Sequence, residues 1–158
     1  MTKRCPTTQI TLGQYVVRRN GVPLGASGAL FNMLKRSLGA GSFMGFWRFW
    51  NPVFGYALGK YIYRPLVCQL PRPVAYILTF IACGLIHDAV TLLVKGSTHF
   101  LFGYWFLYMS IVALVASALN FRFHHRPFST RVLTQICYLY LCYLMAFYSS
   151  RTFDLTGY

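Results

Sequence analysis

The sequence predicts an all-α integral membrane protein, with three transmembrane helices and further interfacial or re-entrant helices on the cytoplasmic side. Hydrophobic residues make up 56% of the 158 residues, and the mean hydropathy is +0.48. Only 11% of the residues are charged, too few for the mixed charged surface that a soluble domain needs. Three apolar stretches are each long enough to cross a bilayer as a helix, which takes about 20 residues. A soluble globular protein is therefore excluded, and so is a disordered chain.

The three predicted spans cover about residues 74–94, 100–121 and 132–149. Pro73 suits the start of the first span because the first residues of a helix need no N–H donor. The segments that connect the spans are short, so we expect consecutive spans to be antiparallel.

Positive charge is distributed unevenly along the chain. There are 15 Lys and Arg residues against 2 acidic residues, which gives a formal net charge of +13. Residues 1–72 and the connection at 122–131 hold all of the Lys and Arg residues except Lys95 and Arg151. Because Lys and Arg concentrate in cytoplasmic loops, we expect a cytoplasmic N-terminus and an exoplasmic C-terminus. The basic charge is thus explained by the orientation of the chain in the membrane. We expect membrane lipid or an anionic cofactor as partners and no nucleic acid.

The region before the first span is predicted to lie at the cytoplasmic membrane surface. Residues 1–25 form a basic segment, and residues 26–158 form one membrane domain that begins with an interfacial helix over 29–38. In that helix, apolar residues recur at helical spacing, with Lys35 and Arg36 elsewhere on its surface.

A second interfacial or re-entrant helix is predicted over 52–64. Asn51 before Pro52 has the pattern of an N-cap followed by proline at the first helical position. Lys60 and Arg64 then lie four residues apart on one face, and Pro65 is expected to end the helix.

Polar residues interrupt the first span at spacings of three and four. They include the adjacent pair His87 and Asp88, and ionisable groups inside a membrane are functional candidates by default. The alternative is that this pair makes hydrogen bonds between helices, which applies to Asp88 above all. Cys83 and His87 could offer two metal ligands, but no third residue follows at a matching spacing, so we expect no metal.

Two segments carry a resemblance to a known family. Residues 46–66 read FWRFWNPVFGYALGKYIYRPL, and residues 83–88 read CGLIHD. Together, and in this order, they resemble the two signatures of membrane-bound O-acyltransferases, and they are most similar to the wax-synthase and sterol-acyltransferase branches. The resemblance covers roughly residues 30–120 and corresponds to the C-terminal part of the longer family members.

The resemblance implies acyl transfer from acyl-CoA to a hydroxyl-bearing acceptor such as a lipid alcohol, a sterol or a glycan. It makes His87 the general base and places Asn51 across the site, with Trp50 and Asp88 in supporting positions. An imidazole can take up a proton near neutral pH, which suits this role. A basic, aromatic cytoplasmic face could hold the phosphorylated donor, and the candidates are Arg48, Lys60 and Arg64.

The alternative interpretation is a non-catalytic membrane subunit or a reduced scaffold that keeps these segments for packing. Three helices cannot easily shield a polar tunnel from lipid on all sides. We therefore expect a homo-oligomer or a partner membrane subunit.

Overall fold

The computed structural model describes residues 10–156, with side chains to residue 152, so residues 1–9 of the predicted basic segment lie outside the described part. Within residues 10–156 the chain is all α, without strands. Its elements in order are α1 (Leu12–Asn20), α2 (Ala29–Leu38), α3 (Phe43–Phe49), α4 (Pro52–Leu58), the π-helical turn η1 (Gly59–Tyr63), α5 (Arg64–Gln69), α6 (Arg72–Lys95), α7 (Leu101–Ala118) and α8 (Phe128–Thr156).

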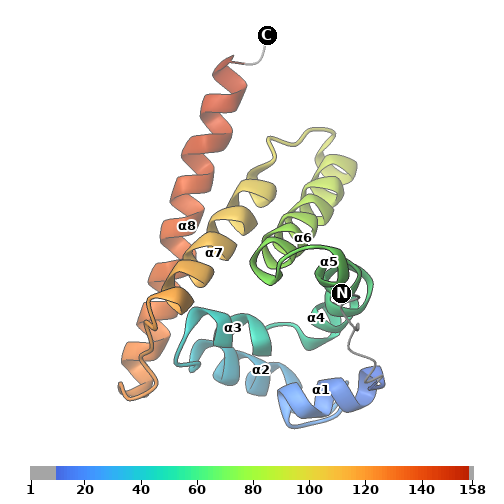
Figure 1. Cartoon of the computed structure of the whole chain (residues 1–158), viewed down its shortest axis with the longest axis vertical. Coiled ribbons are helices and arrows are strands. Elements are labelled where there is room, and N and C mark those ends of the chain that lie inside the picture. Colours follow the sequence, from blue (N-terminus) through green and yellow to red (C-terminus); the bar gives the residue numbers. More distant parts are fainter. Residues whose placement is uncertain (1–9, 157–158) are drawn as a thin grey trace.

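Three helices are long and apolar enough to cross a membrane: α6, α7 and α8. They correspond to the three predicted spans, although their ends differ. α6 starts at Arg72, two residues before the predicted start, whereas α7 ends at Ala118, where Leu119 and then Asn120, with a φ of 54°, interrupt the helix. α8 begins at Phe128 rather than near 132, because the helix starts directly after Pro127. Figure 1 shows these helices running together, with α1 to α3 lying across their lower end.

The short helices differ from the prediction in number and length. α2 has the bounds expected for the interfacial helix at 29–38. α1 and α3 were not predicted. α1 is started by a reciprocal pair of hydrogen bonds between Thr11 and Gln14, and α3 by Ser42, whose side chain accepts a hydrogen bond from the Gly45 amide.

The prediction that a helix ends at Pro65 is wrong. α4 begins at Pro52, as expected, but the chain continues through η1 into α5 and stays helical to Gln69. Pro65 sits in the first turn of α5, where a missing N–H is tolerated. The wider π-helical turn before it accommodates the proline ring without ending the helix.

The long helices are held together by a few polar contacts and close approaches. The Tyr138 hydroxyl of α8 donates to the Met109 carbonyl of α7 at 2.7 Å and accepts the Trp47 Nε1–H of α3 at 3.0 Å. Gln135, fully buried on α8, donates to the carbonyls of Ala40 and Ser42 at 3.0 Å each. These bonds fix α3 and the turn before it against α7 and α8.

Candidate functional site

A cavity of about 440 Å³ lies between the short helices and the faces of α6 and α7. It brings together four residues that the sequence singled out: His87, Asn51, Trp50 and Arg48. The rest of its wall is largely aromatic and includes Tyr15, Trp47, Phe54, Tyr63, Tyr76, Phe80 and Phe106, with Arg19, Thr79 and Cys83 among the remaining members. His87 thus lines the same open cavity as three residues that lie 36 or more positions before it in the sequence.

His87 is half-buried and held in one orientation. Its Nδ1 lies 2.8 Å from the Cys83 carbonyl oxygen, and because a carbonyl can only accept, Nδ1 carries the proton. In the neutral ring, Nε2 then carries the lone pair. The rings of Phe54, Phe102 and Phe106 surround the imidazole at centroid distances of 5.9, 5.5 and 5.3 Å. His87 Nε2 is therefore a potential proton acceptor among apolar side chains.

Asn51 begins α4, as the sequence predicted. Its Oδ1 accepts the Phe54 N–H at 3.1 Å, and its own N–H points to the Met33 sulfur at 3.3 Å. Its backbone is left-handed, with a φ of 38° and a ψ of 72°, a region that asparagine tolerates better than most residues. The Nδ2 group has no hydrogen-bond partner within the described side chains. Asn51 can thus cap the helix with one amide atom and donate to a ligand with the other.

Asp88 faces away from the cavity, although it adjoins His87. It is 2% exposed, and its carboxylate accepts the N–H groups of Phe102 at 3.1 Å and Gly103 at 2.7 Å, at the N-terminus of α7. The Thr98 hydroxyl donates to it at 3.2 Å. A carboxylate is favourable at a helix N-terminus, so this contact stabilises the α6–α7 pair. Asp88 therefore makes hydrogen bonds between helices, which is the alternative that the sequence analysis gave for this residue.

The polar and small residues of α6 lie on two faces of the helix. Thr79, Cys83 and His87 line the cavity, whereas Gly84 and Asp88 meet α7. A Cβ atom on Gly84 would lie 2.6 Å from the Phe102 carbonyl oxygen. Glycine is therefore needed for the helices to approach this closely.

Only one of the three cations predicted to bind the acyl-CoA donor lies at the cavity. Arg48 lines the cavity, but Lys60 and Arg64 do not. The cavity face of α4 and η1 carries Phe54, Gly55, Leu58, Gly59 and Tyr63, so the two cations lie off this face, and the Lys60 ammonium lies over the Tyr56 and Tyr61 rings. Trp50 stacks on Phe46 at 5.3 Å.

The sequence reasoning missed most of the wall residues, and three of them carry polar groups of interest. Arg19 and Tyr15 come from α1, and the Arg19 guanidinium lies 5.0 Å from the Tyr15 ring centre. The capping-box pattern Thr11-x-x-Gln14 was the signal that could have revealed this helix. Tyr76 of α6 also lies on the wall, and its buried hydroxyl has no partner within the described residues.

The described residues hold no group of three or more His, Cys, Asp or Glu side chains that could bind a metal ion. No family model, no curated protein and no solved structure matches the chain.

Proposed function

We propose that the chain is an integral membrane acyltransferase that moves an acyl group from acyl-CoA to a hydroxyl acceptor at the cavity wall. The observation that carries the proposal is His87, whose Nδ1 donates to the Cys83 carbonyl so that the basic Nε2 remains available at the wall of a cavity that Asn51 also lines. The three long apolar helices support membrane insertion. The charge distribution supports a cytoplasmic N-terminus and an exoplasmic C-terminus.

In this mechanism, His87 Nε2 takes the proton from the acceptor hydroxyl, and the hydroxyl oxygen attacks the thioester carbonyl carbon. Negative charge gathers on the carbonyl oxygen of the tetrahedral intermediate, where the Asn51 Nδ2–H can donate a hydrogen bond. The intermediate collapses, the carbon–sulfur bond breaks, and the thiolate takes the proton from the imidazolium. An ester and free CoA are the products.

The walls fit the parts of such a substrate. The aromatic side chains provide an apolar space for the acyl chain. Arg48 and Arg19 supply positive charge for an anionic donor at the side formed by the short helices. A second copy or a partner membrane subunit would shield the remaining sides from lipid.

The alternative is a non-catalytic subunit or scaffold, and two contacts favour it. Asn51 already serves as the α4 cap, and Asp88 already joins α6 to α7. Both residues could therefore be present for stability alone.

The test uses the full chain in lipid nanodiscs with radiolabelled long-chain acyl-CoA and a panel of alcohol, sterol and glycan acceptors. We expect wild-type transfer and its loss in His87→Gln, because glutamine keeps a polar side chain of similar length but cannot act as a base. His125→Gln is the matched control, since His125 lies in the exposed connection between α7 and α8 and does not line the cavity. Transfer that survives His87→Gln contradicts the assigned base, and absence of transfer by the wild type favours the scaffold.

The catalytic role of Asn51 is tested separately with the Asn51→Gly variant. Glycine accepts the left-handed backbone and costs only a few tenths of a kcal/mol at an N-cap, whereas alanine costs about 1 kcal/mol. A catalytic Asn51 predicts that Asn51→Gly folds normally but loses activity. A purely structural Asn51 predicts an active Asn51→Gly variant.

A further inference from the structure

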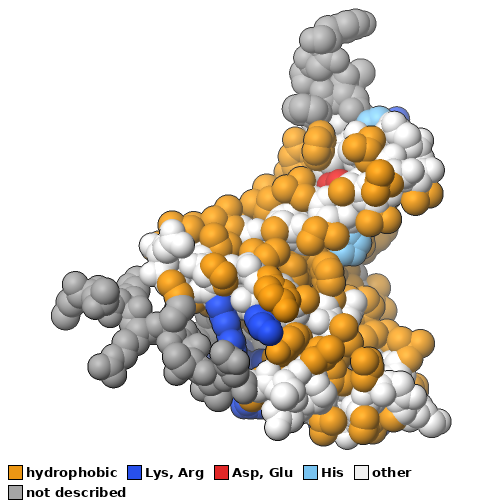
Figure 2. Space-filling view, turned by 90° about the vertical axis from the view of Figure 1, so that its right-hand side faces the viewer, with side chains coloured by type: hydrophobic (Ala, Val, Ile, Leu, Met, Phe, Trp, Pro, Cys, Tyr) orange, Lys and Arg blue, Asp and Glu red, His pale blue; other side chains and the backbone are white. Residues whose placement is uncertain are grey.

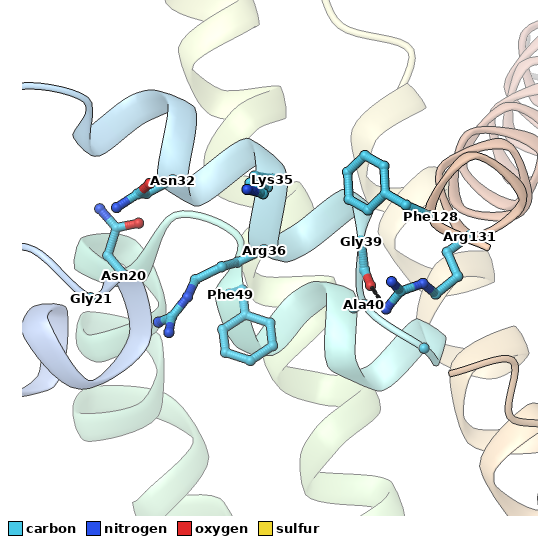
Figure 3. Close-up of a pocket in the computed structure, with 11 residues that line it drawn as sticks. Asn20, Gly21, Asn32, Lys35, Arg36, Gly39, Ala40, Phe49, Phe128 and Arg131 are labelled. Atoms are coloured by element: carbon cyan, nitrogen blue, oxygen red, sulfur yellow. Dashed lines mark hydrogen bonds between the residues drawn. The ribbon is translucent and has the colours of Figure 1, made fainter. Parts of the chain in front are cut away.

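A second cavity, of about 600 Å³, lies at the end of the molecule where α1 and α2 cross below the long helices. Figure 3 shows Asn20 and Asn32 on one side of it and Arg131 with Phe128 on the other. Lys35 and Arg36, from the last turn of α2, complete the polar part of the wall. Three cations from two distant parts of the chain therefore face one space.

These cations lack a counter-charge. Asp88 is the one acidic residue whose side chain the structure describes, and it is committed to the N-terminus of α7. Lys35 and Arg36 would be favourable at the C-terminal end of α2 on electrostatic grounds alone. Arg131 belongs to α8, and its side chain donates to the carbonyl of Gly39, the C-cap residue of α2, so all three cations lie at the same helix end. On the face that Figure 2 presents, Lys and Arg side chains lie mainly in the lower half, with further basic atoms at the upper end.

The two guanidinium groups are oriented by backbone contacts that leave most of their donors unused. Arg36 donates one N–H to the Arg19 carbonyl at 2.6 Å, and Arg131 donates one to the Gly39 carbonyl at 2.7 Å. Each guanidinium has five N–H donors. The Arg36 Cζ atom lies 5.7 Å from the Phe49 ring centre, and the Arg131 Cζ atom lies 5.8 Å from the Phe128 ring centre. These contacts hold both guanidinium groups at the wall.

The wall also contains an acceptor that the protein does not use. Asn20 is 4% exposed, and its Nδ2 donates to the Ala29 carbonyl at 3.0 Å. Its Oδ1 is buried without a hydrogen-bond partner within the described residues. Donors beside a free acceptor suit a ligand that carries both an anion and a hydroxyl group.

We propose that this cavity binds a phosphate ester with a neighbouring hydroxyl group. Arg36, Arg131 and Lys35 bind the phosphate oxygens, and Asn20 Oδ1 accepts the hydroxyl. The phosphate can belong to a lipid headgroup or to a water-soluble ester, since both have this chemistry. The proposal does not depend on the acyl transfer proposed above, because the residues involved do not line the His87 cavity.

The test titrates the purified full chain in neutral detergent with sn-glycerol 3-phosphate and measures binding by phosphorus NMR line broadening and by thermal stabilisation. We expect saturable binding that becomes about tenfold weaker in Lys35→Gln, since a hydrogen bond to a charged group is lost. Lys35 is exposed, so this variant should fold. Arg18→Gln is the matched control, because it removes the same charge from the exposed surface of α1 without touching the cavity.

A second arm identifies the source of the phosphate. The chain is placed in nanodiscs of phosphatidylcholine alone or of phosphatidylcholine mixed with phosphatidylglycerol, and the titration is repeated. Loss of glycerol phosphate binding in the mixed nanodiscs assigns the site to the lipid headgroup, and unchanged binding assigns it to a soluble ester. Equal weakening by Lys35→Gln and Arg18→Gln, or absence of saturable binding in detergent and in phosphatidylcholine nanodiscs alike, overturns the proposal.

Discussion

Replacing Gly84 by alanine tests the contact that places α7 against the helix carrying His87. An alanine Cβ would lie 2.6 Å from the Phe102 carbonyl oxygen and 2.8 Å from the Gly103 Cα atom. Ordinary contact begins at 3.4 Å, so the α7 backbone would have to move by 0.8 Å, the difference between 3.4 and 2.6 Å. Both close atoms belong to the backbone, and no side-chain rotation can relieve them.

The expected cost follows from two effects. Inserting a methyl group into a packed contact costs about 1–3 kcal/mol. The same displacement lengthens the bond from the Gly103 N–H to Asp88, now 2.7 Å, and a hydrogen bond to a charged group contributes about 1.5–3 kcal/mol. After subtracting a gain of about 1 kcal/mol in helix propensity, we expect Gly84→Ala to lower the free energy of unfolding by about 2–5 kcal/mol, equivalent to a drop in Tm on the order of 10 °C.

The assay is thermal unfolding of the purified chain in a mild detergent, followed by circular dichroism. Gly13→Ala is the matched control, because Gly13 lies in α1 with nothing within 4 Å of the added Cβ. That control should be neutral or stabilising by up to about 1 kcal/mol, through helix propensity. A Gly84→Ala protein as stable as the wild type would refute the close approach of the two helices.

Three further perturbations have defined outcomes. Asp88→Ala leaves two amides of α7 without their acceptor, and we expect a loss of about 2–4 kcal/mol by the same unfolding assay, with wild-type stability contradicting the contact. Tyr138→Phe removes the hydroxyl that joins Trp47 to α7, and we expect a loss of about 1–3 kcal/mol, with tryptophan fluorescence reporting the change around the indole. For topology, cysteine introduced at Ser97 should react with an impermeant maleimide from outside the cell and cysteine at Arg126 only after lysis. The reverse pattern would overturn the proposed orientation.

The sequence predicted the long helices well because an apolar run of this length has few alternatives. It also predicted the start of α4, since an asparagine before a proline has a narrow range of local structures. Both features are local, and they depend on a few adjacent residues. The predicted end of α7 lay too far along the chain because apolar residues continue past Ala118, whereas α8 is longer than its apolar run and includes mostly polar residues at both ends.

The composition of the cavity wall could be predicted only in part. His87 and Asn51 stand out as polar residues in apolar or motif-bearing segments, and both line the cavity. Lys60 and Arg64 were expected there, but which face of α4 and η1 points inward depends on how this segment packs on α6. The contribution of Arg19 from α1 depends on the path of the chain between α1 and α4, which no local pattern encodes.

The unequal lengths of the long helices have a consequence for the lipid environment. α7 has 18 residues and α8 has 29, which correspond to about 27 and 43 Å at the helical rise per residue. In a bilayer with a hydrocarbon core of about 30 Å, α8 must tilt or protrude while α7 falls short. In the proposed membrane orientation, a thicker bilayer would pull on the ends of α7, and the bond from the Gly103 N–H to Asp88 would connect that displacement to the helical turn that carries His87. Under the proposed membrane insertion, membrane thickness would be a physical variable that acts on this cavity.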